Sequence, residues 1–153
     1  LIPLPRLYAQ SPPELSIVSA DRVVDPGIPF ELTAHDAPHL IVTRGEHSYE
    51  VGPFVIPGVT PCYQCSQLAR AAQDPFHLTH LRELEAWPLA PLALLAHFAA
   101  AQRVGQLVMD FVSGALTESQ CAQVATICDD GSVRVEDVEP ASRCVCGING
   151  LAS

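Results

Sequence analysis

Four cysteines in two pairs constrain the fold of this chain more than any other feature. Cys62 and Cys65 form a C-x-x-C just after a Pro-Gly turn, and Cys144 and Cys146 form a C-x-C near the end of the sequence. Two such pairs supply four thiolates, the tetrahedral donor set that Zn²⁺ prefers. We therefore predict one structural Zn²⁺ bound by Cys62, Cys65, Cys144 and Cys146, so that two segments distant in sequence meet at one ion.

The same cysteines admit two other interpretations. A thioredoxin-like redox pair would follow the first strand and open a long helix, whereas this C-x-x-C follows a third predicted strand. Disulfides suit small secreted scaffolds, but a chain of 153 residues can bury a core of its own. The other two cysteines, Cys121 and Cys128, are interpreted as small buried apolar side chains.

Charge and composition exclude several classes of function. The net charge is −9, with eight arginines and no lysine, so no basic patch is available to bind nucleic acid or an anionic membrane. The start of the chain is rich in proline and lacks the continuous apolar region of a signal peptide, which favours a cytoplasmic protein. The first residue is leucine rather than methionine, and this leaves open an upstream part of the protein.

The first third of the sequence predicts a parallel strand–helix–strand unit. Residues 15–20 and 39–44 are short apolar runs typical of buried strands, and residues 30–35 between them have a weak helical pattern. A turn at Gly45-Glu46 then leads to a third strand over residues 47–56.

The remainder predicts helices followed by a hairpin. A helix over residues 62–73 ends at Asp74-Pro75, a mobile crossover covers residues 75–88, and a long helix over residues 89–112 stops at Ser113-Gly114. Apolar residues surround much of the long helix, so we expect it to pack against a second chain or an adjoining domain. Strands over residues 121–128 and 133–138 flank a hairpin turn at Asp129-Asp130-Gly131.

Three further features have simpler interpretations. His77 and His80 are spaced to share a helix face, but with no third ligand nearby they are expected at the surface. Asp129 and Asp130 match turn chemistry better than Mg²⁺ coordination. Arg143 lies beside the second cysteine pair, where its charge would offset that of the thiolates.

The segment over residues 51–65, VGPFVIPGVTPCYQC, resembles the ThiF/MoeB-like, ubiquitin-activating-type adenylyltransferases. The order of the elements is similar too: an apolar helix (89–113), a hairpin (121–138) and a second cysteine pair (144–146). The C-x-C spacing of that pair is most similar to the divergent branch found in thiazole/oxazole-modified peptide (bacteriocin) biosynthesis.

The resemblance implies an α/β fold with a Rossmann-like ThiF-type sheet whose N-terminal half is incomplete. It implies one domain over residues 1–153, comprising an irregular arm (1–14), a strand–helix–strand part (15–61) and a zinc-stapled part with helices and a C-terminal hairpin (62–153). A structural zinc far from any nucleotide and a homodimer also follow from the family.

Two departures from the family bear on activity. No G-x-G-x-x-G follows a strand, so the usual phosphate cradle is missing. No cysteine lies between Ser66 and Gln120, where related enzymes carry a reactive one. We therefore do not expect this chain alone to bind ATP and Mg²⁺ or to be catalytic.

Three functions stay open at the level of sequence. The first is a scaffold that presents a precursor leader peptide to a partner modifying enzyme of the cyclodehydratase type, with the peptide adding to an exposed edge of the strands at 15–20 or 39–44. The second is the C-terminal part of an ATP-dependent adenylyltransferase acting on a ubiquitin-like carrier or a peptide C-terminus. The third is a zinc-stabilised oligomerisation module.

Overall fold

A mixed five-stranded sheet organises the molecule in the computed structural model, which describes residues 13–84 and 87–146. The strands lie in the order β1-β2-β3-β4-β5, with β1 and β2 parallel and the other neighbours antiparallel. Their bounds are β1 (Ser16–Asp21), β2 (His39–Arg44), β3 (Ser48–Val55), β4 (Gln123–Cys128) and β5 (Val133–Asp137). The parallel pair joined by a helix confirms the predicted strand–helix–strand unit.

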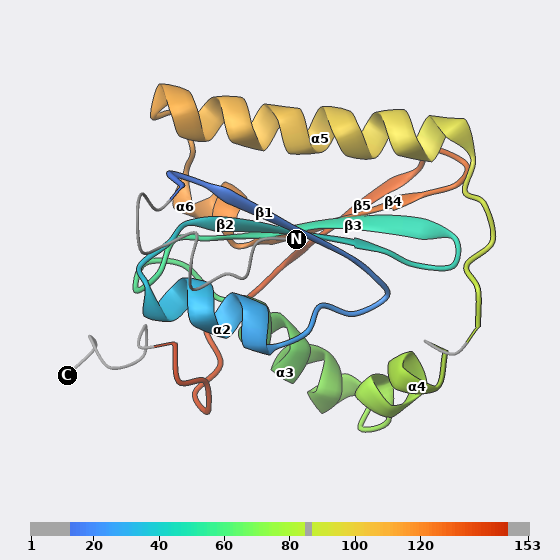
Figure 1. Ribbon diagram of the computed structural model, residues 1–153, viewed down its shortest axis with the longest axis horizontal. Coiled ribbons are helices and arrows are strands. Elements are labelled where there is room, and N and C mark those ends of the chain that lie inside the picture. The colour runs from blue at the N-terminus through green and yellow to red at the C-terminus, as the bar shows by residue number, and fades with distance from the viewer. Residues whose placement is uncertain (1–12, 85–86, 147–153) are drawn as a thin grey trace.

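Helices lie on both faces of this sheet, which gives an α/β fold of three layers (Figure 1). The helix α5 (Leu94–Ser113) crosses one face, and α2 (Gly27–Ala34), α3 (Tyr63–Gln73) and α4 (His77–Leu84) lie on the other. A short helix, α6 (Glu118–Cys121), precedes β4. None of the helices in the described ranges is both long and apolar enough to cross a membrane.

Three apolar clusters hold these layers together. The largest joins the sheet to α5 and includes Leu40, Phe54, Leu107 and Ile127. A second surrounds the paired cysteines, and a third packs Val24, Ile41 and Tyr63 beneath α2 and α3. Within the described residues, β1 forms one edge of the sheet and β2 lies inside it, so only the first of the two candidate docking strands has an open side.

The predicted crossover over residues 75–88 is wrong over His77–Leu84, where α4 forms. The side chain of Asp74 accepts a hydrogen bond from the Phe76 backbone N–H at 2.9 Å. Aspartate followed by proline thus ends α3 and begins α4, because aspartate satisfies free N–H groups and proline fits the first helical turn.

The long helix begins five residues later than the sequence analysis predicts. Ala90 precedes Pro91, and the residue before a proline is disfavoured in the helical conformation, so the helix does not start at residue 89. The N–H of Ala93 instead donates to Asp129 Oδ1 at 2.8 Å, so the hairpin turn fixes the start of α5. Gly114, with φ of 73°, ends the helix as predicted.

The first hairpin strand is also shorter than predicted, because Cys121 belongs to α6. Thr117 and Gln120 form a reciprocal capping box that starts this helix. Cys121 is completely buried in the cluster beneath α5, which agrees with its interpretation as a small apolar side chain, and Cys128 at the end of β4 is half-buried.

Candidate metal centre and adjoining groove

The four paired cysteines converge on one point at the end of the sheet. Cys62 caps the N-terminus of α3, Cys65 lies in its first turn, and Cys144 and Cys146 follow β5. Their sulfur atoms all lie within 4.8 Å of one another. The site is built where it is because β3, α3 and the segment after β5 share the cluster that contains Val55, Val124 and Val138.

The sulfur–sulfur distances fit a tetrahedral ion. Cys62 and Cys144 are separated by 3.4 Å, Cys65 and Cys146 by 3.7 Å, and Cys62 and Cys65 by 3.8 Å. A Zn–S bond of about 2.3 Å in a tetrahedron requires sulfur atoms ~3.8 Å apart, whereas a disulfide requires about 2.05 Å. All four are free thiols in the structure. The donor set therefore suits a closed, structural metal ion and leaves no coordination position for a substrate.

The surroundings favour the thiolate at Cys65 and the protonated thiol at Cys62 and Cys144. Contact with Cys62 lowers the pKa of Cys65 to about 5 and raises the pKa of Cys62, while burial raises the pKa of Cys144 to about 11. The N–H of Ala141 donates to Cys65 Sγ at 3.4 Å, and the N-terminus of α3 presents its positive dipole end. A bound cation would displace the protons of the cysteine thiols, so metal binding and thiol deprotonation are coupled.

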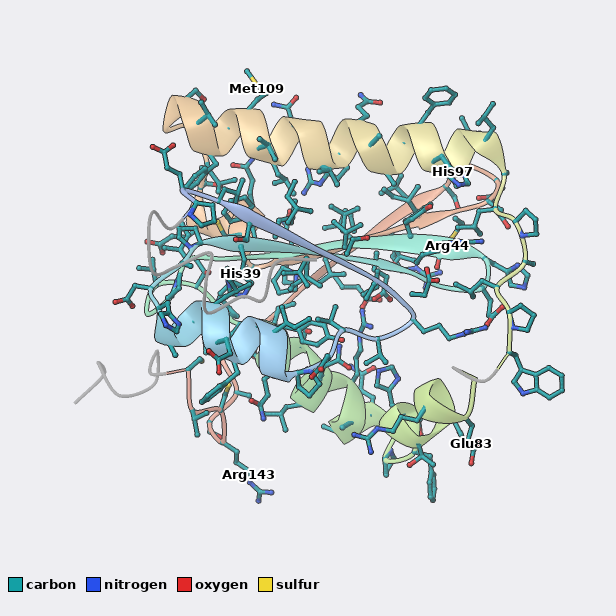
Figure 2. All side chains as sticks on the ribbon, in the orientation of Figure 1. His39, Arg44, Glu83, His97, Met109 and Arg143 are labelled. Atoms are coloured by element: carbon teal, nitrogen blue, oxygen red, sulfur yellow. The ribbon has the colours of Figure 1, made fainter. Side chains whose placement is uncertain are left out.

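The other residues singled out in the sequence are not part of the cluster of four cysteines. Arg143 is exposed, and its side chain points away from the sheet (Figure 2). His77 and His80 lie on α4, where His80 is 3.9 Å from Asp74 Oδ2. Asp130 forms the predicted turn by accepting from the Ser132 N–H, and hydrogen bonds from the side chain and then the backbone of Ser132 lower the pKa of Asp130.

An apolar groove adjoins the metal centre and was not predicted. It has a volume of about 900 Å³ and lies between the facing sides of α2 and α3, with Cys62, Cys144 and Cys146 among its lining residues. Its helical positions recur at intervals of three and four residues, a signal that the sequence contains. Only the structure shows that the two helix faces are opposite each other.

A second, smaller cleft of about 120 Å³ lies at the carboxyl ends of β1 and β2. Its charges are paired internally. Arg22 Nε donates to Glu46 Oε1 at 2.8 Å, and Arg70 Nη1 donates to Glu50 Oε2 at 2.8 Å. His77 also lines this cleft, and burial lowers its pKa.

Comparison with known proteins identifies the fold. No family model matches the sequence, and no curated protein matches it either. Among solved structures, E. coli MccB with MccA superimposes with a TM-score of 0.67 and 18% identity over 92% of this chain. The microcin C7 biosynthetic enzyme MccB in complex with N-formylated MccA gives 0.63 and 16% over 92%. A heterocyclase in complex with substrate and cofactor gives 0.64 and 17% over 89%.

The likeness is one of fold, and it covers part of each larger protein. This chain spans 41% of the MccB chain with MccA and 21% of the heterocyclase chain. The matches confirm, at the level of fold, the predicted resemblance to the ThiF/MoeB-like proteins.

Proposed function

We propose that this chain is a peptide-binding scaffold of ThiF-like type that presents a precursor leader peptide to a partner modifying enzyme, such as a cyclodehydratase. The observation that carries the proposal is the shared fold with MccB bound to MccA and with a heterocyclase bound to its substrate. In keeping with its expected cytoplasmic location, the chain would work in a reducing compartment, as a homodimer and without ATP or Mg²⁺ of its own.

In this proposal Zn²⁺ has a structural role. The 3.4–3.8 Å sulfur separations support four-thiolate coordination by Cys62, Cys65, Cys144 and Cys146. Such an ion would fix the segment after β5 against α3, and its binding energy would contribute directly to folding. Four thiolates would fill its coordination sphere, so no catalytic step is assigned to it.

The direct test is calorimetric titration of the zinc-loaded protein with the leader of a precursor peptide encoded beside its gene. We expect saturable binding with a 1:1 stoichiometry per chain. A scrambled leader of the same composition is the control, because it preserves charge and hydrophobicity. Absence of binding by a folded, zinc-loaded protein would contradict the scaffold function.

The alternative function is the C-terminal part of an ATP-dependent adenylyltransferase acting on a ubiquitin-like carrier or a peptide C-terminus. It is favoured by one observation, that the chain matches only 41% of the MccB chain. ATP–pyrophosphate exchange separates the two functions when it is measured on the full-length gene product, because this chain alone carries no phosphate cradle. The scaffold predicts no exchange above background with leader peptide present, whereas peptide-dependent exchange would establish the adenylyltransferase.

A zinc-stabilised oligomerisation module is the remaining alternative. The exposed apolar side chains of α5 favour it, since Leu94, Phe98 and Val112 are each at least 66% exposed. Assembly without any peptide binding would identify this function, and assembly together with peptide binding would fit the scaffold.

A further inference from the structure

We propose that the groove between α2 and α3 holds an apolar segment of the precursor peptide, one that carries a carboxylate beside its apolar residues. This inference rests on the proposed function and adds to it the place and chemistry of binding. It replaces the open edge of β1 as the docking place.

Two walls of the groove are helix faces that lie opposite each other. On α2 and the residue before it the lining positions are Pro26, Pro29, Phe30, Thr33 and Ala34, and on α3 they are Tyr63, Gln64, Gln67, Leu68 and Ala71. Both sets follow helical periodicity, so each is one continuous face. Phe30 is 60% exposed on its wall. At about 900 Å³ the space lies in the range of ligand-binding pockets, and its mostly apolar lining calls for an apolar occupant.

Gln67 and Arg82 are the polar groups in the groove that indicate what else the occupant must carry. Gln67 Oε1 is shielded from solvent and has no hydrogen-bond partner among the described residues. A buried acceptor of this kind is costly to leave unpaired, and rotation of the Gln67 side chain into the groove would let a main-chain N–H of the peptide satisfy it.

The charges in the groove favour an acidic partner. Among the lining residues Asp25 is already engaged, because its Oδ1 accepts from the Gly27 N–H at 2.9 Å. Arg82 lines the same groove and has no ion pair among the described residues. Neither residue forms an ion pair among the described residues, but Asp25 has a hydrogen-bond partner and the Arg82 guanidinium has none, in a protein whose net charge is −9. A carboxylate on the peptide would complement Arg82.

The metal centre forms one wall of the same groove. Cys144, Val145 and Cys146 line it, and Val145 is 77% exposed between its two cysteines. Loss of the ion would free this segment and remove the wall. Peptide binding in the groove must then weaken when the metal is removed, and by linkage the peptide must tighten metal binding by the same factor.

The experiment compares a matched pair of exposed phenylalanines on opposite faces of the molecule. The synthetic leader peptide described above is titrated into the zinc-loaded wild-type protein. The same titration is repeated with the zinc-loaded variants Phe30→Ser and Phe98→Ser. Phe30 is 60% exposed and Phe98 is 66% exposed, so neither substitution removes a core residue. We expect Phe30→Ser to weaken binding at least tenfold and Phe98→Ser to leave it within twofold.

A third variant tests the charge. Arg82→Gln should weaken binding about three- to tenfold and reduce its dependence on salt, because a screened ion pair is lost. A leader whose acidic residues are replaced by their amides should bind the wild-type protein and Arg82→Gln equally well.

The outcomes separate failure of the groove from failure of the scaffold. Wild-type binding that is unchanged in Phe30→Ser and survives metal chelation would overturn the groove, and leave the edge of β1 as the docking place of a working scaffold. No binding by the wild-type protein would overturn both proposals. Loss of binding in Phe30→Ser alone, with zinc content and secondary structure unchanged, supports the groove.

Discussion

At the scale of single residues, the cysteine spacing predicts the proximity of the four sulfur atoms but not what surrounds them. A C-x-x-C at a helix start is visible in sequence because the ligands and the helix signal coincide at Cys62. The Ala141 N–H that donates to Cys65 cannot be recognised in the sequence, because every residue except proline has a backbone N–H. Second contacts of this kind orient ligands and adjust their basicity.

Replacing one cysteine of the cluster of four, and separately one cysteine outside it, tests the metal site. Cys146→Ser should reduce bound zinc to well below one equivalent per chain and lower the free energy of unfolding, because metal binding stabilises only the folded state. Cys128→Ser, on β4 and outside the cluster of four, is the control and should keep one equivalent. Metal analysis by mass spectrometry measures both. Equal zinc contents in the two variants would contradict the assignment.

His39 gives a prediction for pH dependence. It is completely buried between the sheet and α2 (Figure 2), its Nδ1 is 2.9 Å from the Ala37 carbonyl oxygen, and burial lowers its pKa. The unfolded chain therefore takes up this proton at a higher pH than the folded chain. Stability is retained above the ordinary histidine pKa of about 6.5 and falls as pH decreases from there toward the folded value.

The variant His39→Asn isolates this contribution, because the asparagine amide can still donate to Ala37 but does not titrate. We expect the free energy of unfolding of the wild type to decrease more steeply than that of the variant between pH 7 and the folded pKa. Urea denaturation with zinc present measures the difference. Parallel curves would show that His39 does not contribute.

At the scale of elements, local signals predict most of the fold, and the misses have local causes. The sequence predicts the buried strand β2, the end of α5 at Gly114 and the turn between β4 and β5. The first turn of α4 and the capping box of α6 were missed, although Asp74-Pro75 and the Thr117–Gln120 spacing are start signals. The order of strands β3 and β4, and the groove between α2 and α3, depend on contacts between distant segments, which one sequence does not reveal.

Gly52 illustrates such a contact and provides a prediction for β3. Its φ is 118°, and a Cβ there would collide with the backbone carbonyl of Gln123 on β4. Gly52→Ala should therefore cost more than about 2 kcal/mol of stability, since backbone cannot move aside as a flexible side chain does. Gly58→Ala is the matched control, because Gly58 has φ of 72° with open space around it and should cost only about 1 kcal/mol. Equal losses in urea denaturation would show that strain alone, not the strand contact, determines the cost.

At the scale of the whole molecule, the face of α5 that points away from the sheet is uncharged. Its exposed apolar and small positions are Leu94, Phe98, Ala101, Gly105, Met109 and Val112, at helical spacing, with the small residues at the centre. No exposed position of α5 is Asp, Glu, Lys or Arg. Figure 2 shows Met109 directed into solvent on this side. In a protein of net charge −9, this is the face on which two copies would repel each other least.

The structure also decides which substitution can test assembly through α5. Leu107 would be a natural choice from the apolar pattern, but it is 2% exposed and packs against the sheet, so its replacement would damage the core. Phe98 and Met109 are 66% and 63% exposed, so their replacement would not disturb the core. Val133 and Val135 of β5 extend the surface, since they pair with Ile127 and Ala125 on the sheet face that α5 covers.

We expect the doubly substituted protein Phe98→Glu with Met109→Glu to sediment as a monomer at concentrations where the wild type is a dimer. A helix of 20 residues is about 30 Å long, and two such faces packed antiparallel would bring the central Ala101 and Gly105 into close contact. Four carboxylates at that seam would be both desolvated and close to one another, so dissociation should shift by at least tenfold in concentration. Phe30→Glu, on the opposite side of the sheet, is the control and should sediment like the wild type. A wild-type protein that stays monomeric at 100-fold higher concentration would contradict a homodimer through this face of α5. Equal sedimentation of all three proteins as dimers would place the interface elsewhere.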